Sequence, residues 1–171
     1  MQHVALELGT VAVVALLWLA AWCDVATRTI PNRICIALAI IGLIIRVTSG
    51  LHGMTLSVVT AAILFVALAL LHVRKAIGGG DVKLLAALAL GLPPLEVYHL
   101  MIATVFAGGL LAFLHLTLRL LPSPAPCPAG AANLHRVLAA ERWRIRRHGS
   151  LPYGVAIACG GSLVFLSGIG G

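Results

Sequence analysis

Six apolar stretches, separated by short polar or proline-containing links, make up most of the 171-residue chain. They cover residues 4–22, 32–48, 54–72, 82–92, 95–121 and 151–169. A helix needs about 20 apolar residues to cross the hydrocarbon core of a bilayer, so the second stretch is at the short end of the range and the fourth is too short. The pattern predicts an all-α integral membrane protein, organised as a six-helix transmembrane bundle.

The short fourth stretch has a consequence for the residue before it. At about 1.5 Å per residue, residues 82–92 extend only about 16 Å, roughly half of the hydrocarbon core. Pro93 and Pro94 end this stretch. If the prolines lie at the outer surface, Asp81 lies below the cytoplasmic surface, in a cavity that must admit water.

Composition agrees with a single membrane domain over residues 1–171. The chain is 61% hydrophobic and 10% charged, and its mean hydropathy is +1.08. These values exclude an ordinary soluble domain, which has about a quarter charged residues. The chain has four cysteines but no CxxC pair, and its seven histidines form no HExxH motif. We therefore expect no disulfide framework, no metal site and no cofactor.

The net charge of +7 indicates how the protein is oriented in the membrane, because basic residues gather in cytoplasmic loops. We do not expect binding to nucleic acid. With the N-terminus outside, alternation of the six stretches places eleven of the twelve basic residues at the cytoplasmic side and only Arg46 at the other. The cytoplasmic group includes the loop 122–150, whose basic helix-like part either lies on the membrane surface or anchors the topology. The eleven residues are Arg28, Arg33, Arg74, Lys75, Lys83, Arg119, Arg136, Arg142, Arg144, Arg146 and Arg147.

The chain contains only two aspartates, Asp24 and Asp81, and each adjoins an apolar stretch. An odd number of crossings precedes both, so the two carboxyl groups are expected on the same side of the membrane. Ionisable groups at membrane depth usually mark function, and two carboxyl groups that share a site can hold one proton between them. That arrangement suits an aspartic protease, in which one carboxylate activates water and a protonated carboxyl donates to the scissile carbonyl.

Other interpretations of the same residues remain open. Gly78, Gly79 and Gly80 would let a substrate backbone approach Asp81, but they also fit a flexible turn that ends in an aspartate N-cap. Asp24 alone fits an interfacial anchor. A small transporter or channel subunit would use the two aspartates as a proton or cation relay, and an assembly subunit would need neither.

Three local motifs resemble the type IV prepilin peptidases, membrane aspartic proteases of the GxGD class. Residues 23–32 (CDVATRTIPN) are similar to the family's first-aspartate motif, and residues 78–83 (GGGDVK) fit GxGDxK. Residues 151–156 (LPYGVA) are similar to its closing Pro-Tyr-Gly segment. The resemblance implies that Asp24 and Asp81 form the catalytic pair in the inner membrane of a bacterium. It also implies that the substrate is a prepilin cut at the cytoplasmic face, with the pilus assembly machinery and lipids as further partners.

The chain lacks the cytoplasmic CxxC domain that many members carry, so N-methyltransferase activity is not expected. This short form resembles the peptidases of Tad or Flp pili, which process small pilins and pseudopilins. Among possible supporting residues, Lys83 and Arg28 could favour ionisation of a carboxyl group or contact an acidic side chain of the substrate. Asn32 could cap a helix or orient the substrate, and Tyr153 could do likewise or lie in an aromatic belt.

Two glycine pairs are also candidates for close helix packing. They are Gly108–Gly109 in the fifth stretch and Gly160–Gly161 in the sixth.

Overall fold

The computed structural model describes residues 2–47, 50–120 and 151–167. Within these ranges the chain forms six helices and no strand, which confirms the predicted all-α fold. The basic part of the loop 122–150 lies outside the described residues. The helices are α1 (Gln2–Thr27), α2 (Asn32–Val47), α3 (Gly50–Val73), α4 (Gly79–Ala89), α5 (Pro94–Leu120) and α7 (Tyr153–Ser167).

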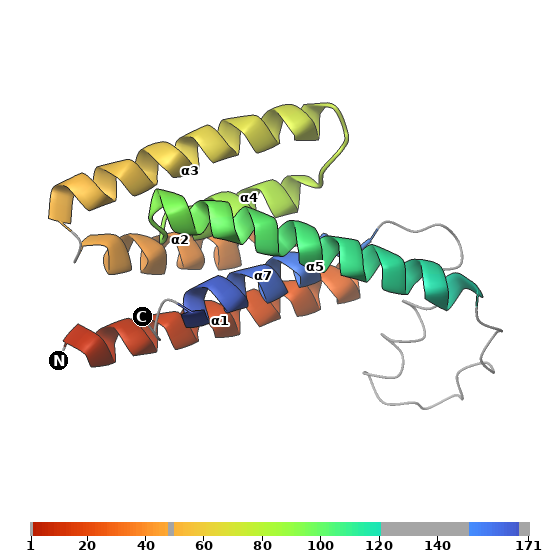
Figure 1. Ribbon diagram of the computed structural model, residues 1–171, viewed down its shortest axis with the longest axis horizontal. Coiled ribbons are helices and arrows are strands. Elements are labelled where there is room, and N and C mark those ends of the chain that lie inside the picture. The colour runs from red at the N-terminus through yellow and green to blue at the C-terminus, as the bar shows by residue number, and fades with distance from the viewer. Residues whose placement is uncertain (1, 48–49, 121–150, 168–171) are drawn as a thin grey trace.

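The helices alternate in direction along the chain. Figure 1 shows the C-terminal ends of α1, α3 and α5 on the right, where α2, α4 and α7 begin. Asp24 in the last turns of α1 and Asp81 in the first turn of α4 therefore lie at the same end of the bundle. The prediction that the two aspartates lie on the same side is confirmed for the ends of the bundle.

Arg46 lies near the opposite end, where α2 leads to α3. Its Nε donates to Ser57 Oγ at 2.9 Å, and its Nη2 donates to the carbonyl oxygen of Gly53 at 3.2 Å. Ser57 is fully buried. These bonds join the two helices and satisfy a guanidinium group that the apolar surroundings would otherwise destabilise.

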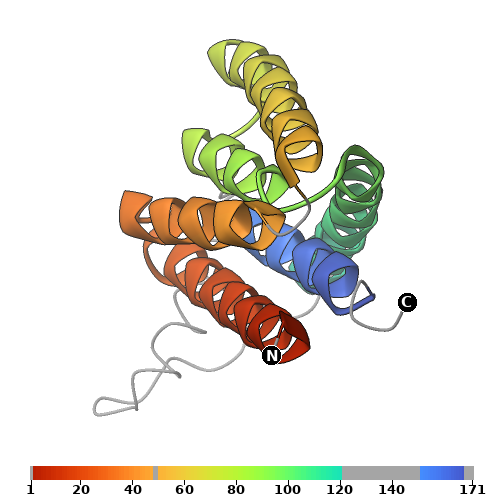
Figure 2. The same cartoon turned by 90° about the vertical axis from the view of Figure 1, so that its left-hand side faces the viewer.

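Helix α7 lies at the centre of the bundle. Figure 2 shows it between α1 and α5, and it also contacts α4. Nine of its 15 residues are buried, and the exposed ones include the apolar Leu163 and Leu166, as expected of a helix with no polar face. Glycines allow this packing, since a Cβ at Gly160 would lie 2.7 Å from the Thr104 backbone nitrogen and one at Gly161 would lie 2.9 Å from Leu17. The prediction for this pair of glycines is confirmed.

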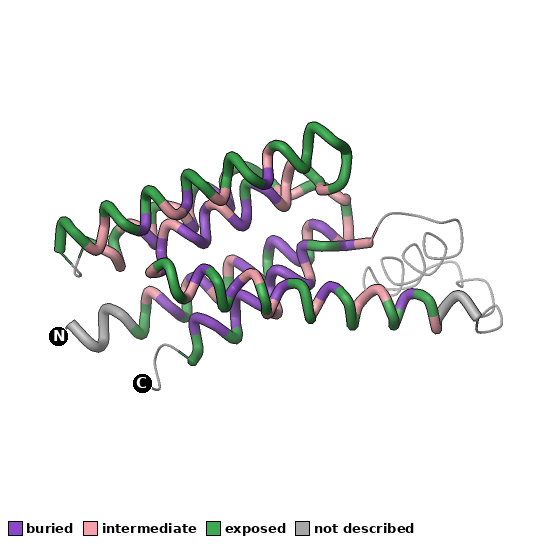
Figure 3. The backbone as a smooth tube through the Cα atoms, turned by 45° about the horizontal axis from the view of Figure 1, so that its top comes forward, coloured by how far each residue is buried: buried purple, intermediate pink, exposed green. Residues whose placement is uncertain are grey.

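The outer helices bury only one face. Figure 3 shows α3 and α5 with long exposed surfaces, and these surfaces are made of large apolar side chains such as Ile63, Val66 and Phe106. Glu7–Thr27, Gly50–Val73 and Pro94–Thr117 are each long and apolar enough to cross a membrane. The chain is therefore a helical membrane protein. The other described helices are shorter, with 16, 11 and 15 residues in α2, α4 and α7.

Two predicted boundaries differ from the structure near the aspartates. Helix α1 continues past Trp22 to Thr27, so Asp24 lies inside the helix and not after it. Helix α4 begins at Gly79 instead of residue 82, because the glycine segment forms its first turn and is not a separate flexible turn. The apolar stretches are limited at these points because Asp24 interrupts the first and Gly79, Gly80 and Asp81 precede the fourth.

Close helix packing predicts opposite effects for two glycine substitutions. Gly160→Ala places a methyl group against the α5 backbone and should destabilise the protein by about 1–3 kcal/mol. Gly109→Ala meets no atom within 4 Å and should stabilise helix α5 by up to about 1 kcal/mol. Thermal unfolding of the two variants in the same detergent measures the difference. Equal midpoints would contradict the proposed tight contact of α5 with α7.

Candidate active site

Asp24 continues the buried stripe of α1. Val13, Leu17 and Ala20 are buried, and Asp24 follows at helical spacing with only 8% of its surface exposed. The side chain therefore points into the bundle and not toward lipid. The helix ends at Thr27, and the next residue, Arg28, adopts a left-handed φ of 57° and donates its N–H to the Asp24 carbonyl oxygen at 2.9 Å.

The Asp24 carboxylate accepts a hydrogen bond from the backbone of α7. Gly154 N–H donates to Asp24 Oδ2 at 2.8 Å, in a contact between residues 130 positions apart. A buried carboxylate needs such donors, because an unpaired charge in an apolar interior is strongly unfavourable. A Cβ on residue 154 would lie 2.8 Å from Asp24 Cβ and 2.9 Å from Oδ2. Only glycine fits this position without movement of a helix.

Asp81 lies in the first turn of α4, three positions after the N-cap residue Gly78. Its carboxylate accepts a hydrogen bond from the Gly78 backbone N–H, as the third residue of a capping box does. The interpretation of Asp81 as the N-cap itself is therefore wrong. Leu84 and Leu85, one turn later, are buried, so Asp81 also starts a stripe that faces the bundle interior.

The two carboxyl groups are close enough to influence each other. Asp81 lies outside the three candidate membrane spans. The pKa of its carboxyl group is raised from 3.8 to about 6, mostly by burial and also by the negative charge of Asp24, while the Gly78 hydrogen bond acts in the opposite direction. The neighbouring charge matters because two carboxylates that share a site resist simultaneous ionisation.

Contacts with the neighbouring elements hold the glycine turn before Asp81. Ile30, in the link between α1 and α2, lies where a Cβ of Gly80 would meet it at 3.4 Å. His72, at the end of α3, makes a hydrogen bond through Nδ1 to the Ile77 carbonyl oxygen at 2.8 Å, and its ring covers Gly79. No sequence pattern points to His72, since an isolated histidine at a helix end belongs to no recognisable motif.

The supporting residues predicted from the sequence separate into two groups. Lys83 and Asn32 come together, because Lys83 Nζ donates to Asn32 Oδ1 at 3.1 Å and so joins α4 to the start of α2. Tyr153 is 45% exposed and its ring lies against Gly108 of α5, so it is the adjacent Gly154 that contacts an aspartate. Gly109 meets no neighbouring atom within 4 Å, so the packing prediction is wrong for that glycine.

No group of three or more histidine, cysteine, aspartate or glutamate side chains gathers into a metal-binding cluster within the described ranges. The chemistry that this arrangement can perform is proton transfer by two carboxyl groups. One is buried in contact with a main-chain donor, and the other has a raised pKa.

Comparison with known proteins identifies the group to which the fold and the motifs correspond. Residues 11–113 match the type IV leader peptidase family, over more than half of the chain. The chain belongs to the type IV leader peptidase family. This membership indicates a membrane-embedded peptidase and implies prepilin substrates. The matched region contains both Asp24 and Asp81, whereas Gly154 lies beyond it. No curated protein and no solved structure matches the chain significantly.

The Gly154 contact predicts that this peptidase is sensitive to one added methyl group. Gly154→Ala should move the N–H away from Asp24 Oδ2 and lower kcat/KM at least about tenfold, as loss of one charge-assisted hydrogen bond does. Cleavage of a prepilin by the purified variant measures the effect, and Gly109→Ala is the control for a glycine without close neighbours. Wild-type turnover in Gly154→Ala would contradict the structural role of the contact.

Proposed function

We propose that the chain is an aspartic endopeptidase that removes the leader of a prepilin with Asp24 and Asp81. The observation that carries this proposal is the position of both carboxyl groups at one end of the bundle, each on the inward face of its helix. Their mutual electrostatic influence also supports it. A pair in this state supplies one proton donor and one proton acceptor, which peptide hydrolysis requires.

The two carboxyl groups have different surroundings, which suggests different roles. Asp81, with its raised pKa, is the proposed proton donor, and Asp24, held by the Gly154 N–H, is the proposed base. The Asp24 carboxylate takes a proton from water as the water oxygen attacks the scissile carbonyl carbon. Asp81 gives its proton to the carbonyl oxygen. When the tetrahedral intermediate collapses, the C–N bond breaks, the leaving amine takes the proton that Asp24 received, and a hydroxyl group of the intermediate returns a proton to Asp81.

The finer identity of the substrate rests on the sequence motifs. We propose small pilins or pseudopilins of the Tad or Flp type, cut at the cytoplasmic face of the bacterial inner membrane after a leader that ends in glycine. The short link between α1 and α2, from Arg28 to Pro31, leaves no room for a cytoplasmic CxxC domain at that position. This agrees with peptidase activity without N-methylation.

Replacement of either aspartate should abolish cleavage. Asp24→Asn and Asp81→Asn each remove one proton-transfer group and should lower kcat at least about a hundredfold. Cleavage of a prepilin by purified protein in detergent or lipid measures the loss, and unfolding midpoints verify that the bundle is intact. Glu7→Gln is the matched control, because Glu7 is an exposed carboxylate on the first helix.

Ion flux separates the peptidase from a proton or cation relay. If both asparagine variants cleave normally, the proposed function is wrong. A relay would instead show aspartate-dependent flux into liposomes without any cleavage.

The raised pKa of Asp81 predicts the alkaline limit of cleavage. Asp81 is protonated below about pH 6 and loses its proton as the pH rises through that value, which removes the proposed donor. The rate should therefore fall on the alkaline side with an apparent pKa near 6 or above, instead of the value near 4 of an ordinary aspartate. A pH profile of kcat/KM measures this value. A fall in the rate near pH 4 would show that the proton donor is a group other than Asp81.

A further inference from the structure

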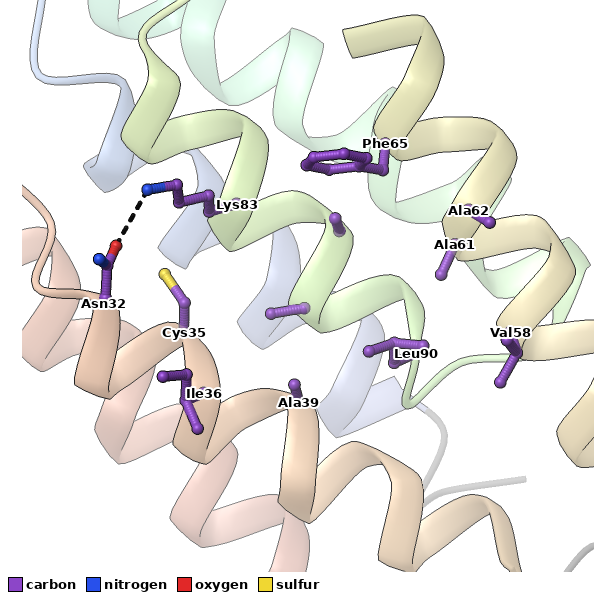
Figure 4. A pocket seen from close by; sticks show the side chains of 12 residues that line it. Asn32, Cys35, Ile36, Ala39, Val58, Ala61, Ala62, Phe65, Lys83 and Leu90 are labelled. Carbon is purple, nitrogen blue, oxygen red and sulfur yellow. Dashed lines mark hydrogen bonds between the residues drawn. The ribbon is translucent and has the colours of Figure 1, made fainter. Parts of the chain in front are cut away.

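A groove of about 590 Å³ lies between α2, α3 and α4, at the same end of the bundle as the aspartates and extending away from it. Figure 4 shows Asn32 and Lys83 at one end of the groove and Leu90 and Val58 toward the other. Lys83 in α4 and Leu90 at its C-cap are seven residues apart, so the groove extends about 10 Å, or roughly two helical turns.

The walls of the groove are apolar and its floor is made of small side chains. Five of the twelve lining residues are alanines, and of these Ala61 and Ala87 are buried. Small residues let another helix approach closely within a membrane. Ile36 and Phe65 form rims with exposed apolar surface. This shape suits one face of an apolar helix laid along the groove.

A single cation lies at the end of the groove nearest the aspartates. Lys83 Nζ donates to the neutral amide of Asn32, and it forms no ion pair with a carboxylate of the described residues. An ammonium group at the edge of an apolar membrane groove favours an occupant that carries a negative charge at the matching point. Charge complementarity therefore indicates an apolar helix with an acidic side chain near one end.

The groove and Asp81 lie on opposite faces of α4. At 100° per residue, Lys83 projects about 200° away from Asp81 around the helix axis. The path between the two faces crosses the start of α4, at the N-cap Gly78 and the next residues Gly79 and Gly80. These glycines are exposed or partly exposed, with His72 against Gly79 and Ile30 against Gly80, so an extended chain would cross beside these two side chains. Only a few residues at about 3.3 Å each are needed.

We propose that this groove is the binding site for the apolar segment of the substrate, with its acidic side chain paired to Lys83 and its scissile bond led over the glycine turn to the aspartates. The inference rests on the proposed peptidase function and adds the location of the substrate. In this arrangement only a few residues of the substrate lie between its scissile bond and the apolar segment that is bound in the groove.

Disulfide cross-linking tests the location directly, because Cys35 lines the groove. The probe is a precursor peptide with a basic leader, a glycine and an apolar segment with one acidic residue, carrying a single cysteine at successive positions. The full-length protein carries Asp81→Asn to retain the uncut probe, and Cys23, Cys127 and Cys159 are replaced by serine. Cross-links to Cys35 should recur every three to four residues, as one helical face predicts. Their absence, or equal yields at all positions, would overturn the proposal.

Filling the groove provides a kinetic test with a matched control. Ala62 of α3 lines the groove and is exposed, so Ala62→Phe occupies it without disturbing the core. Ala67→Phe makes the same change at an exposed position of α3 that does not line the groove. Ala62→Phe should lower kcat/KM at least about tenfold, mainly through KM, whereas Ala67→Phe leaves it unchanged. Equal kinetics in the two variants would contradict the proposed site.

Charge reversal tests the role of Lys83. Lys83→Glu should weaken cleavage of the acidic probe at least about tenfold, and a probe with lysine at the acidic position should recover most of the rate. Equal cleavage of both probes by this variant would contradict the pairing. If lipid, detected by native mass spectrometry, fills the groove and Ala62→Phe expels it without any effect on cleavage, the site binds lipid and the proposal is wrong.

The result for the wild-type enzyme distinguishes the two hypotheses. If the wild type does not cut the precursor, the proposed function is wrong, and so is the assignment of the groove to a substrate. If the wild type cuts and the aspartate variants do not, while the cross-links are absent and the groove variants behave normally, only the groove assignment fails.

Discussion

The burial of an aspartate carboxylate in an apolar bundle is the constraint on which the site depends. Asp24 lies almost fully inside, and the donor that it needs comes from the backbone of α7, through the Gly154 N–H. Because a backbone donor must come close, residue 154 has no space for a side chain. The hydrogen bond therefore fixes how α7 sits against α1, and α7 in turn contacts α4, which carries Asp81.

The second aspartate, Asp81, is held by the first turn of its own helix. The glycine turn forms the beginning of α4, and its Gly78 N–H partly stabilises the Asp81 carboxylate. Burial and the charge of Asp24 act in the opposite direction and raise the pKa of Asp81. Two chemically identical side chains thus lie in different surroundings, and such a difference lets a carboxyl pair supply an acid and a base together. The membership in a peptidase family agrees with such a pair.

Helix α4 carries residues of both proposed sites. With 11 residues it is too short to cross the hydrocarbon core. The same helix presents Asp81 inward and Lys83 toward the groove between α2 and α3. Gly79 and Gly80, after the N-cap Gly78, lie between these two faces. A substrate that remains partly in the membrane would thereby reach the aspartates without leaving the surface of the protein.

The sequence by itself determined the helical class, the six helices of the described ranges, their alternation and the placement of both aspartates at one end, because hydropathy and helix number depend only on local residue order. Whether the bundle forms one domain and whether the aspartates are catalytic stay predictions. Tertiary structure alone decided that Gly154, and not Tyr153, contacts Asp24, that His72 covers the glycine turn and that Lys83 meets Asn32. These contacts join residues whose relative positions depend on how α7, α3 and α2 pack. Local sequence patterns do not encode that packing, since it is set by the fit of side chains across the whole bundle.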